Sequence, residues 1–570
     1  MPTAKQPLSP VTTCIAAAML AAAVFAVYSP ALNYQFILDD HRFLADPRLQ
    51  FSGHVWEYFT SYVWAQTVGG PPCFYRPLFV LWLRLNFVLN GASPWGWHLL
   101  SIAKHVSVAV LLGVLVWKLL RDRAAALMAG TLFALHPAQT ESVAWVTVPD
   151  PLMSAAVLGT VLLYLAYAER VSAEGEPNAE NHRKKSRKEI RSKSTGSSPV
   201  AWMIASSAAC LAALMAKETA LVLPVVLFVI TSMVPIRKAD EAKSEEDEGF
   251  RNRLVSAFRE TVPFLGVTVV YLLLRINALN GHFSPLTQHL PWRTLLLSWP
   301  AILWFYVKVI VWPVRPQAFA DPILANEFSA RGVLLPGLEV CCAAVLLAGV
   351  CVWARRKARH DLPEREATGV KRALALGVLL LVLPILLTLN LNVLNPGDFL
   401  HGRYTYLPLA GLMLLLATGW HLAGRSLTKK SLIAMISAAG LIAVTSAVLT
   451  VWQESGWTDD LTVFTTAHRC APHNQPVALN LARAKVQVAL GLDEAGRCDE
   501  AMPMFEQAIQ QYPQDWFAWA GRGECLVKLN DLPGAEQSLR RASELSHEPR
   551  VAEEWRQVRA MMGLNTEPPK

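Results

Sequence analysis

The chain has 570 residues, of which 53% are hydrophobic and 17% are charged. So small a charged fraction provides too little polar surface for soluble domains alone, which excludes a purely soluble protein. The formal net charge is +8, but the basic residues gather in short loops between apolar runs. This placement indicates membrane topology rather than a nucleic-acid-binding surface. Nine cysteines are scattered along the chain, and their spacing does not indicate a metal site.

Apolar runs near the length that crosses a hydrocarbon core of about 30 Å recur along residues 1–452. They predict an all-α, polytopic membrane domain over residues 1–452 with about eleven transmembrane helices. The predicted helices cover residues 11–28, 98–120, 124–137, 152–168, 201–216, 220–235, 262–279, 333–354, 374–389, 404–421 and 431–451. We expect the first to remain as an anchor, although its alanines leave cleavage as a secretory signal open.

The basic loops set the expected orientation, because Lys and Arg are retained on the cytoplasmic side of a membrane. Arg121 and Arg123 follow the second predicted helix, and residues 169–198 form a long basic segment two helices later, on the same side. We expect this segment to be a disordered cytoplasmic loop. An eleven-helix count then places the C-terminal tail on the opposite, outer side.

Two further apolar segments are expected to lie along the membrane instead of crossing it. Residues 292–314 would break the alternation of the basic loops if they crossed, and their tryptophans and prolines suit the headgroup region. We therefore predict a re-entrant or interfacial segment there. Residues 74–89 are amphipathic and include Arg76 and Arg84, which favours the outer surface.

The tail, residues 457–570, regains charge and contains a repeat with a period of 34 residues. The repeated positions are Ala501, Phe505, Ala508 and Pro513, followed by Ala535, Leu539, Ala542 and His547. This period and these small residues are typical of tetratricopeptide (TPR) repeats, and they predict a helical solenoid of about two and a half units. Cys498 and Cys525 fall at stacking distance in this register, which leaves a disulfide between them open.

An acidic pair, Asp39 and Asp40, follows the first predicted helix by about ten residues, just outside the membrane. Adjacent carboxylates in an extended or turn segment point in different directions. One of them could therefore act as a general base while the other binds the backbone or a cation. A solvated loop or a helix N-cap would explain the pair equally simply.

Polar and charged residues also occur at the outer ends of several other predicted helices. They are Arg76, His98, His105, His136, Glu141, Lys217, Glu218, Arg275, Arg403 and Tyr404. Ionisable groups at membrane depth are costly and mark functional cavities, although each could be a packing or snorkelling residue. The cations suit a phosphate or an anionic lipid. The two histidines at 98 and 105 share a helix face, and we expect hydrogen bonding rather than a metal.

Taken together, these motifs resemble the TMTC-type (transmembrane and TPR repeat-containing) O-mannosyltransferase-like proteins of the GT-C class of glycosyltransferases. The resemblance covers most of the chain and rests on Asp39-Asp40, Tyr75-Arg76-Pro77-Leu78, His98, His105, Phe133 to Pro137, Glu141 to Trp145, Lys217-Glu218 and Arg403 to Pro408. It implies transfer of a sugar from a polyprenyl-phosphate donor to a protein or glycan hydroxyl. Asp39 or Asp40 would then act as base, and Arg76, Lys217 or Arg403 would hold the donor phosphate. Inverting displacement of this kind requires neither a metal nor another cofactor.

The sequence departs from the family pattern in two places. The repeat array is short, and residues 146–150, Val-Thr-Val-Pro-Asp, lack the Arg that relatives tend to have before the Asp. Donor or acceptor preference could differ accordingly. Two other functions stay open: a non-catalytic membrane scaffold that recruits a partner through its repeats, and a polymerase or ligase of surface glycans. We expect a bacterial inner membrane, with the repeat domain in the periplasm.

Overall fold

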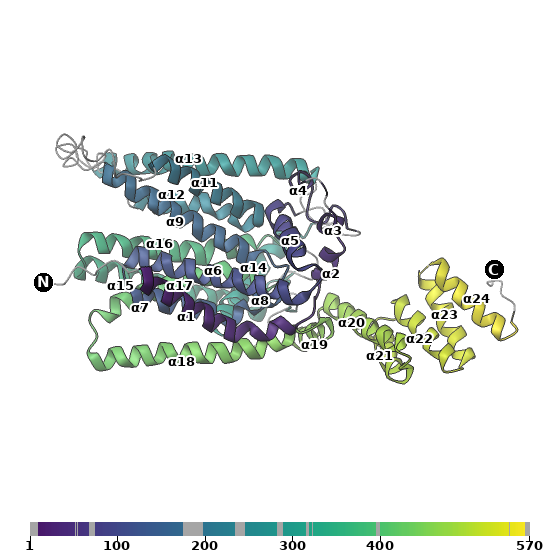
Figure 1. Ribbon diagram of the computed structural model, residues 1–570. Helices are drawn as coiled ribbons and strands as arrows, with labels where there is room; N and C mark the ends of the chain where they lie inside the picture. The colour runs from purple at the N-terminus through teal and green to yellow at the C-terminus, as the bar shows by residue number, and fades with distance from the viewer. Residues whose placement is uncertain are drawn as a thin grey trace. The chain divides into compact units, whose positions relative to one another are not determined.

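A computed structural model describes residues 10–51, 53, 55–67, 74–174, 198–233, 246–281, 289–314, 319–321, 323–394, 400–546 and 548–564. Within these ranges every regular element is a helix (Figure 1), which confirms the predicted all-α class. The chain divides into two compact units. The first holds residues 1–314, 323–395 and 402–455, and the second holds the tail from Gly456 with two short segments, 315–322 and 396–401.

The first unit is a bundle of long helices joined by short ones. In chain order its elements are α1 (Pro10–Tyr28), η1 (Ser29–Asn33), α2 (Asp39–Leu44), α3 (Pro47–Gln50), α4 (Glu57–Thr60), α5 (Pro77–Asn90), α6 (Pro94–Leu120), α7 (Arg123–Ala134), η2 (Pro137–Gln139), α8 (Thr140–Ala144), α9 (Asp150–Glu174), α11 (Pro199–Ala216), η4 (Glu218–Val222), α12 (Leu223–Met233), α13 (Glu246–Leu279), α14 (Trp292–Val311), η6 (Ala330–Leu334), α15 (Leu335–Asp361), α16 (Glu364–Leu387), η7 (Leu391–Val393), η8 (Gly402–Thr405), α17 (Tyr406–Gly424), α18 (Lys429–Glu454) and, at the boundary with the tail, η9 (Ser455–Trp457).

Ten helices in the described residues are long and apolar enough to cross a membrane. They include α14, which lies in the segment 292–314. Two of the eleven predicted spans instead form shorter apolar helices, α7 with 12 residues and Glu218–Met233, which joins η4 to α12. Most of the predicted basic loop, residues 175–197, and the loop at residues 234–245 with Arg237 and Lys238 lie outside the described residues.

Both ends of α14 contact the same end of the bundle. Near its start, the backbone nitrogen of Leu290 donates to Asn392, and the indole of Trp299 donates to the carbonyl of Leu389 at 3.1 Å, both just beyond α16. Past its other end, the carbonyl of Pro313 accepts from Gln453 near the end of α18. A helix that lies along the membrane surface or re-enters it has both ends on the same side of the bilayer. We therefore keep the interfacial or re-entrant interpretation for α14.

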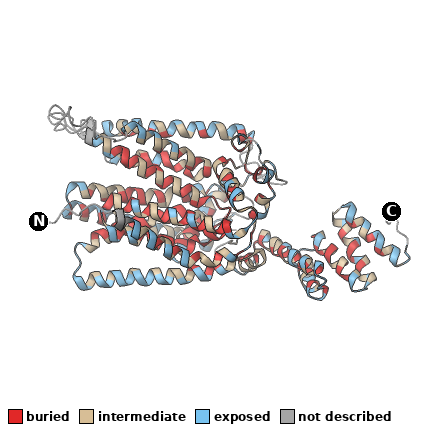
Figure 2. Cartoon of the chain, in the orientation of Figure 1, coloured by how far each residue is buried: buried red, intermediate tan, exposed pale blue. Residues whose placement is uncertain are grey.

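Close backbone approach holds the centre of the bundle together. Gly377 of α16 faces Gly411 of α17, where a Cβ on Gly411 would lie only 2.5 Å from the backbone nitrogen of Leu381. Small residues allow such approach in membrane helices, where packing rather than the hydrophobic effect drives association. Figure 2 shows the opposite situation at α18, whose surface is largely exposed, as expected of a helix that faces lipid.

Four short helices, α2 to α5, gather at one end of the bundle, which we call the outer end (Figure 1). Hydrogen bonds between Asp40 and Thr147 and between Glu141 and Arg403 bring α8 and η8 to this end. The four short helices pack around a buried aromatic core. This core includes Phe43, Tyr58, Trp64, Phe79 and Trp97. The predicted amphipathic segment 74–89 corresponds to α5, whose Phe79 and Leu83 point into this core. Asp39 and Asp40 therefore belong to a group of short helices packed on this core.

The second unit consists of antiparallel helices with small residues at their contacts. Its helices are α19 (Asp460–Cys470), α20 (Gln475–Glu494), α21 (Cys498–Gln511), α22 (Trp516–Lys528), α23 (Leu532–Ser546) and α24 (Pro549–Met561). Phe505 packs against Gly521, where a Cβ would lie 2.4 Å from the Phe505 ring, and Leu539 fills the same role beside Gly523. Phe505 and Leu539, which are 34 residues apart in the sequence repeat, thus pack against neighbouring glycines of the same helix, α22.

Candidate functional site

Asp40 is buried at the outer end and holds two distant segments together. Its Oδ1 accepts hydrogen bonds from the Thr147 hydroxyl at 2.6 Å and the Thr147 backbone nitrogen at 3.3 Å. Its Oδ2 accepts from the backbone nitrogen of Ile37 at 3.1 Å. Burial raises the pKa of Asp40 to about 7, against the opposing effect of these hydrogen bonds. Oδ1 thus ties the loop to Thr147, while Oδ2 closes a turn within the loop itself.

Asp39 differs from its neighbour in exposure and in backbone context. It is the first residue of α2 and is partly buried, whereas Asp40 is fully buried. The preceding residue, Leu38, has φ 55° and ψ −125°, a conformation that costs a leucine about 1–3 kcal/mol. The pair lies at the start of a helix rather than in an extended segment, so the two side chains leave the helix about 100° apart.

Glu218 joins two arginines from different helices. Its carboxylate pairs with Arg76 at 2.9 Å and with Arg275 at 2.8 Å. Arg76 directly precedes α5, and Arg275 lies in α13, so this ion pair network connects three elements that are far apart in the sequence. All three residues were predicted site residues.

Lys217 forms a second, deeper ion pair. Its ammonium lies 2.6 Å from Oδ1 of Asp150 at the start of α9, and both side chains are almost fully buried. The same ammonium lies 4.9 Å from the centre of the Tyr404 ring, a cation–π contact. The positive charges of Arg76 and Arg403 act on Lys217, so this pair adjoins both neighbouring ion pairs.

Arg403 and Glu141 form a third pair. Glu141 accepts from the backbone nitrogen of Arg403 at 2.9 Å and lies 3.4 Å from its guanidinium. The guanidinium also lies 4.6 Å from the centre of the Trp145 ring. Among the ion pairs in the described residues of this region, four cations, Arg76, Lys217, Arg275 and Arg403, share three carboxylates. These seven side chains therefore have an excess of positive charge at the outer end.

Of the three predicted histidines, His98 and His105 are buried and His136 is partly exposed. His105 uses both ring nitrogens: Nε2 donates to the carbonyl of Ala134 at 2.9 Å, and Nδ1 accepts from the Tyr406 hydroxyl at 2.7 Å. His136 caps η2, since its Nδ1 accepts from the backbone nitrogen of Ala138. His98 is fully buried and meets Tyr34 edge to face. The expected hydrogen-bonding role thus describes His105 and His136.

Three residues of this region were not among the predicted site residues. Asp150 pairs with Lys217, Thr147 holds Asp40, and Lys104 of α6 is buried with its ammonium 3.4 Å from the carbonyl of Val146. The negative charges of Asp40 and Asp150 act on Lys104. A lysine inside an apolar span is a recognisable signal. Thr147 had no comparable signal, because its partner lies 107 residues away.

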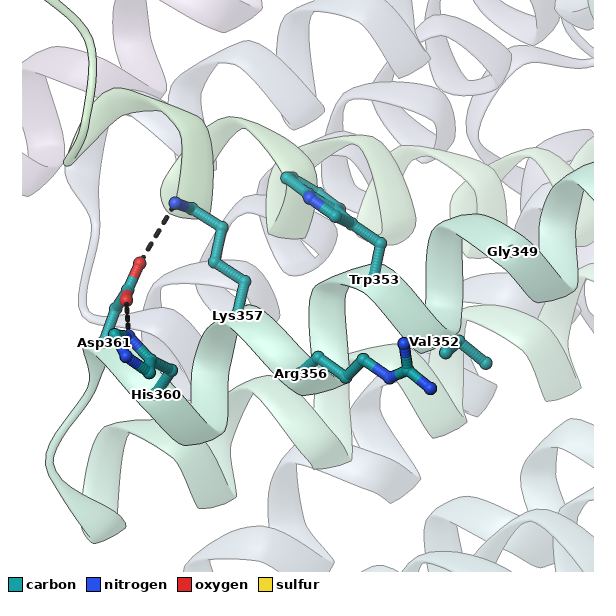
Figure 3. A pocket seen from close by; sticks show the side chains of 7 residues that line it. All are labelled: Gly349, Val352, Trp353, Arg356, Lys357, His360 and Asp361. Atoms are coloured by element: carbon teal, nitrogen blue, oxygen red, sulfur yellow. Dashed lines mark hydrogen bonds and ion pairs between the residues drawn. The ribbon is translucent and has the colours of Figure 1, made fainter.

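A groove of about 490 Å³ lies elsewhere, along the C-terminal half of α15. Figure 3 shows Lys357 and His360 both directed toward Asp361, at 3.0 and 2.7 Å, while Arg356 extends along the helix toward Val352. All of its lining residues belong to α15, and it contains none of the predicted site residues. The groove is therefore separate from the outer-end cluster.

Both the repeat tail and the membrane unit are similar in sequence to known proteins. A family model for the tetratricopeptide repeat matches residues 494–557. Protein O-mannosyl-transferase Tmtc3 of Drosophila melanogaster is 23% identical over 523 residues, covering 83% of this chain and 52% of the relative. The mouse protein O-mannosyl-transferase TMTC3 is 22% identical over 554 residues, covering 92% and 54%. The chain resembles the TMTC-type O-mannosyl-transferases along most of its length.

This TMTC-type resemblance has limits in extent. The chain spans about half the length of these two relatives. Two solved structures are also similar: the archaeal oligosaccharyltransferase AglB from Archaeoglobus fulgidus, with 12% identity, a TM-score of 0.41 and coverage of 97% of this chain and 68% of that one, and ArnT from Cupriavidus metallidurans, with 15% identity, a TM-score of 0.37 and coverage of 92% and 79%. At these TM-scores the likeness is weak, and no feature of the site depends on it.

Proposed function

We propose that this protein is a membrane glycosyltransferase that moves a sugar from a polyprenyl-phosphate donor to a hydroxyl acceptor on the extracytoplasmic face. The observation that carries the proposal is the juxtaposition at the outer end. There an ordered acidic loop lies at the same end of the bundle as a cluster in which four cations share three carboxylates. The sugar is mannose by analogy with the activity that the relatives' names state.

Asp39 is the proposed general base, and Asp40 is a positioning residue. Asp40 has both oxygens engaged with Thr147 and Ile37, whereas Asp39 is partly exposed at the start of α2. In the reaction the acceptor oxygen attacks the anomeric carbon while Asp39 takes the hydroxyl proton. The bond from the anomeric carbon to the phosphate oxygen breaks, and polyprenyl phosphate leaves with the electron pair.

Arg76, Lys217 and Arg403 are the groups that stabilise the departing phosphate. Breaking the glycosidic bond adds negative charge to the phosphate, and fixed cations in a low-dielectric site stabilise that charge in the transition state. The two arginines can offer paired N–H donors to phosphate oxygens, and the Lys217 ammonium offers a compact charge. This chemistry needs no metal or other cofactor.

The remaining assignments follow the same analogy. We place the membrane unit in a bacterial inner membrane and the repeat tail in the periplasm, on the side of the outer end. The TPR helices would then bind a protein or glycan acceptor, or a protein partner, in the same compartment. Membrane lipid would surround α15 and α18, and nucleic acid has no role.

The test uses full-length protein in detergent, a polyprenyl-phosphate mannose with a radiolabelled sugar, and a panel of serine- and threonine-containing peptides and of glycans. Asp39→Asn should lower transfer at least about 100-fold, because the amide cannot accept the acceptor proton, and circular dichroism should show a folded protein. Glu57→Gln, in the same loop, is the matched control and should stay within about twofold of wild type. Equal transfer by Asp39→Asn and wild type would exclude the base role.

A non-catalytic scaffold is favoured by one specific observation. Each of the four cations already pairs with a carboxylate, as in a network that only stabilises the fold. A scaffold would transfer no sugar to any acceptor and would leave the donor intact during long incubation. Measurable consumption of the donor by wild type, lost in Asp39→Asn, separates the enzyme from the scaffold even when the acceptor panel lacks the natural acceptor.

A further inference from the structure

The repeat tail contains a buried cluster of two thiols and a carboxylate, with a partly exposed ammonium group at its edge. Cys498 is the first residue of α21, Cys525 lies in α22, and Asp493 lies near the end of α20. Both Sγ atoms lie 3.0 Å from the same oxygen, Oδ1 of Asp493. The three ligand atoms all lie within 4.8 Å of one another. The two cysteines are therefore close enough to react with one another after small side-chain rotations.

The surroundings bury the two thiols and balance the charge of the carboxylate. Cys498 and Cys525 are 4% and 0% exposed, and they form part of a core with Phe505 and Ala501. The second carboxylate oxygen of Asp493 pairs with the Lys528 ammonium at 2.8 Å. Because Lys528 already neutralises Asp493, the carboxylate can remain ionised while both thiols donate to it.

We propose that Cys498 and Cys525 form a disulfide that ties α21 to α22 in the folded repeat tail. In the bond-forming reaction the two thiols and one external disulfide, R–S–S–R, give the Cys498–Cys525 disulfide and two R–SH thiols. The two thiol protons pass to the released thiolates, and the external disulfide accepts the electrons. A disulfide of this type is expected in the extracytoplasmic compartment that we proposed for the tail, although the chemistry itself does not depend on the transferase function.

The timing of the reaction follows from the cluster's environment. Burial and the Asp493 carboxylate raise the pKa of both thiols, so few thiolates form once the tail has folded. The disulfide should therefore form during folding, while the thiols are still accessible to an oxidant. After folding, both the oxidised and the reduced forms should persist, because neither exchanges quickly.

A divalent metal is the competing occupant of this cluster. Two cysteines and an aspartate supply three ligands of the kind that zinc prefers. The Lys528 ammonium disfavours binding of a metal cation, since this positive charge already lies 2.8 Å from the Asp493 carboxylate. The two occupants make opposite predictions about thiols and metal content, so one preparation distinguishes them.

The experiment uses the full chain, produced once with oxidised glutathione present and once with dithiothreitol. After denaturation and alkylation, mass spectrometry should find a Cys498–Cys525 peptide pair only in the oxidised preparation. Hydrogen exchange of α21 and α22 should be at least tenfold slower in that preparation than in the reduced one. Cys498→Ala and Cys525→Ala should abolish this difference, whereas Cys470→Ser, at an exposed cysteine of the same unit, should preserve it.

Recovery of both cysteines as alkylated thiols from the oxidised preparation would overturn the proposal, as would a dominant pairing of either with Cys470. Stoichiometric zinc that a chelator removes, together with two unpaired thiols, would assign the cluster to a metal instead. None of these results depends on sugar transfer. A protein inactive as a transferase can still contain the disulfide, and an active one can lack it.

Discussion

At the scale of single residues, two adjacent aspartates at the outer end have opposite environments. The carboxylate of Asp40 accepts three hydrogen bonds and is 1% exposed, so it cannot reach a substrate without leaving Thr147 and Ile37. Asp39 begins α2 and remains partly exposed. Replacing either residue should therefore lower activity, and the replacement of Asp40 should also lower stability through the loss of its contacts with Thr147 and Ile37.

The stability effect of Asp40→Asn should depend on pH. Its pKa is raised from near 3.8 to about 7 in the folded protein, so its contribution to stability is complete below about pH 4 and declines as pH rises through 7. Asn does not titrate. The melting temperature of Asp40→Asn should consequently fall further below wild type at pH 5 than at pH 8.

Thermal unfolding in detergent across this pH range measures the difference. Asp499→Asn, at an exposed aspartate of α21, is the control and should follow the wild-type curve at both pH values. A gap between Asp40→Asn and wild type that widens with rising pH would mean that the carboxylate titrates in its ordinary range and that burial does not dominate.

The sequence could predict the presence of these charges but not how they are shared. Arg76, Lys217, Glu218, Arg275 and Arg403 all stand out as ionisable residues at the ends of apolar runs, where they are costly. Glu218 pairs with both Arg76 and Arg275, whereas Lys217 pairs with Asp150. This choice of partners depends on the directions of side chains that are up to 142 residues apart in the sequence. No local pattern encodes such a choice.

At the scale of helices, Glu218 is the point where three elements meet. It begins η4, and its two arginine partners belong to the start of α5 and to α13. Removing a carboxylate that neutralises two partly buried guanidinium groups leaves both with an uncompensated charge. The outer ends of these elements should then separate.

Glu218→Gln should lower the free energy of unfolding by about 2 kcal/mol, since the two arginines lose their shared partner in a partly dry site. Glu366→Gln breaks the ion pair with Arg425, in which both side chains are more than a third exposed, and should cost less than about 1 kcal/mol. Urea titration of both variants in detergent gives the comparison. Equal effects would show that the outer-end cluster is fully hydrated.

Hydropathy located the long helices well, because length and apolar composition are local properties. Hydropathy could not distinguish a helix that crosses the membrane from one that lies along its surface: α14 has 20 residues and is mostly apolar, yet both of its ends contact the outer end. Helices α7 and α12 are shorter than their predicted spans, because His136-Pro137 and Lys217-Glu218 interrupt the backbone near the outer end. Those interruptions place the site residues at the cluster.

At the scale of the whole molecule, the predicted topology puts the outer end and the repeat tail in one compartment and the basic loops in the other. Our proposals for the tail, the acceptor and the disulfide share this expectation. It can be tested without any enzymatic activity.

In a variant that retains Cys470 as its one cysteine, a membrane-impermeant maleimide should label intact spheroplasts, because Cys470 is exposed in the tail. A second variant with Ser192→Cys alone, in the basic loop, should react only after the membrane is permeabilised. Labelling is read by mobility shift on a gel. The reverse pattern would place the outer end in the cytoplasm and remove the basis for an extracytoplasmic transferase.

Leu38 also has a consequence for how the protein would evolve. Its backbone angles, φ 55° and ψ −125°, lie in a region that glycine adopts without strain and leucine adopts only with strain. Leu38→Gly should raise the melting temperature if relief of strain outweighs the added chain entropy of glycine, yet slow transfer by loosening Asp39. A library selected only for yield would accumulate glycine at this position, and one selected for sugar transfer would keep leucine. Sequencing the two pools would reveal whether stability and catalysis favour different residues at position 38.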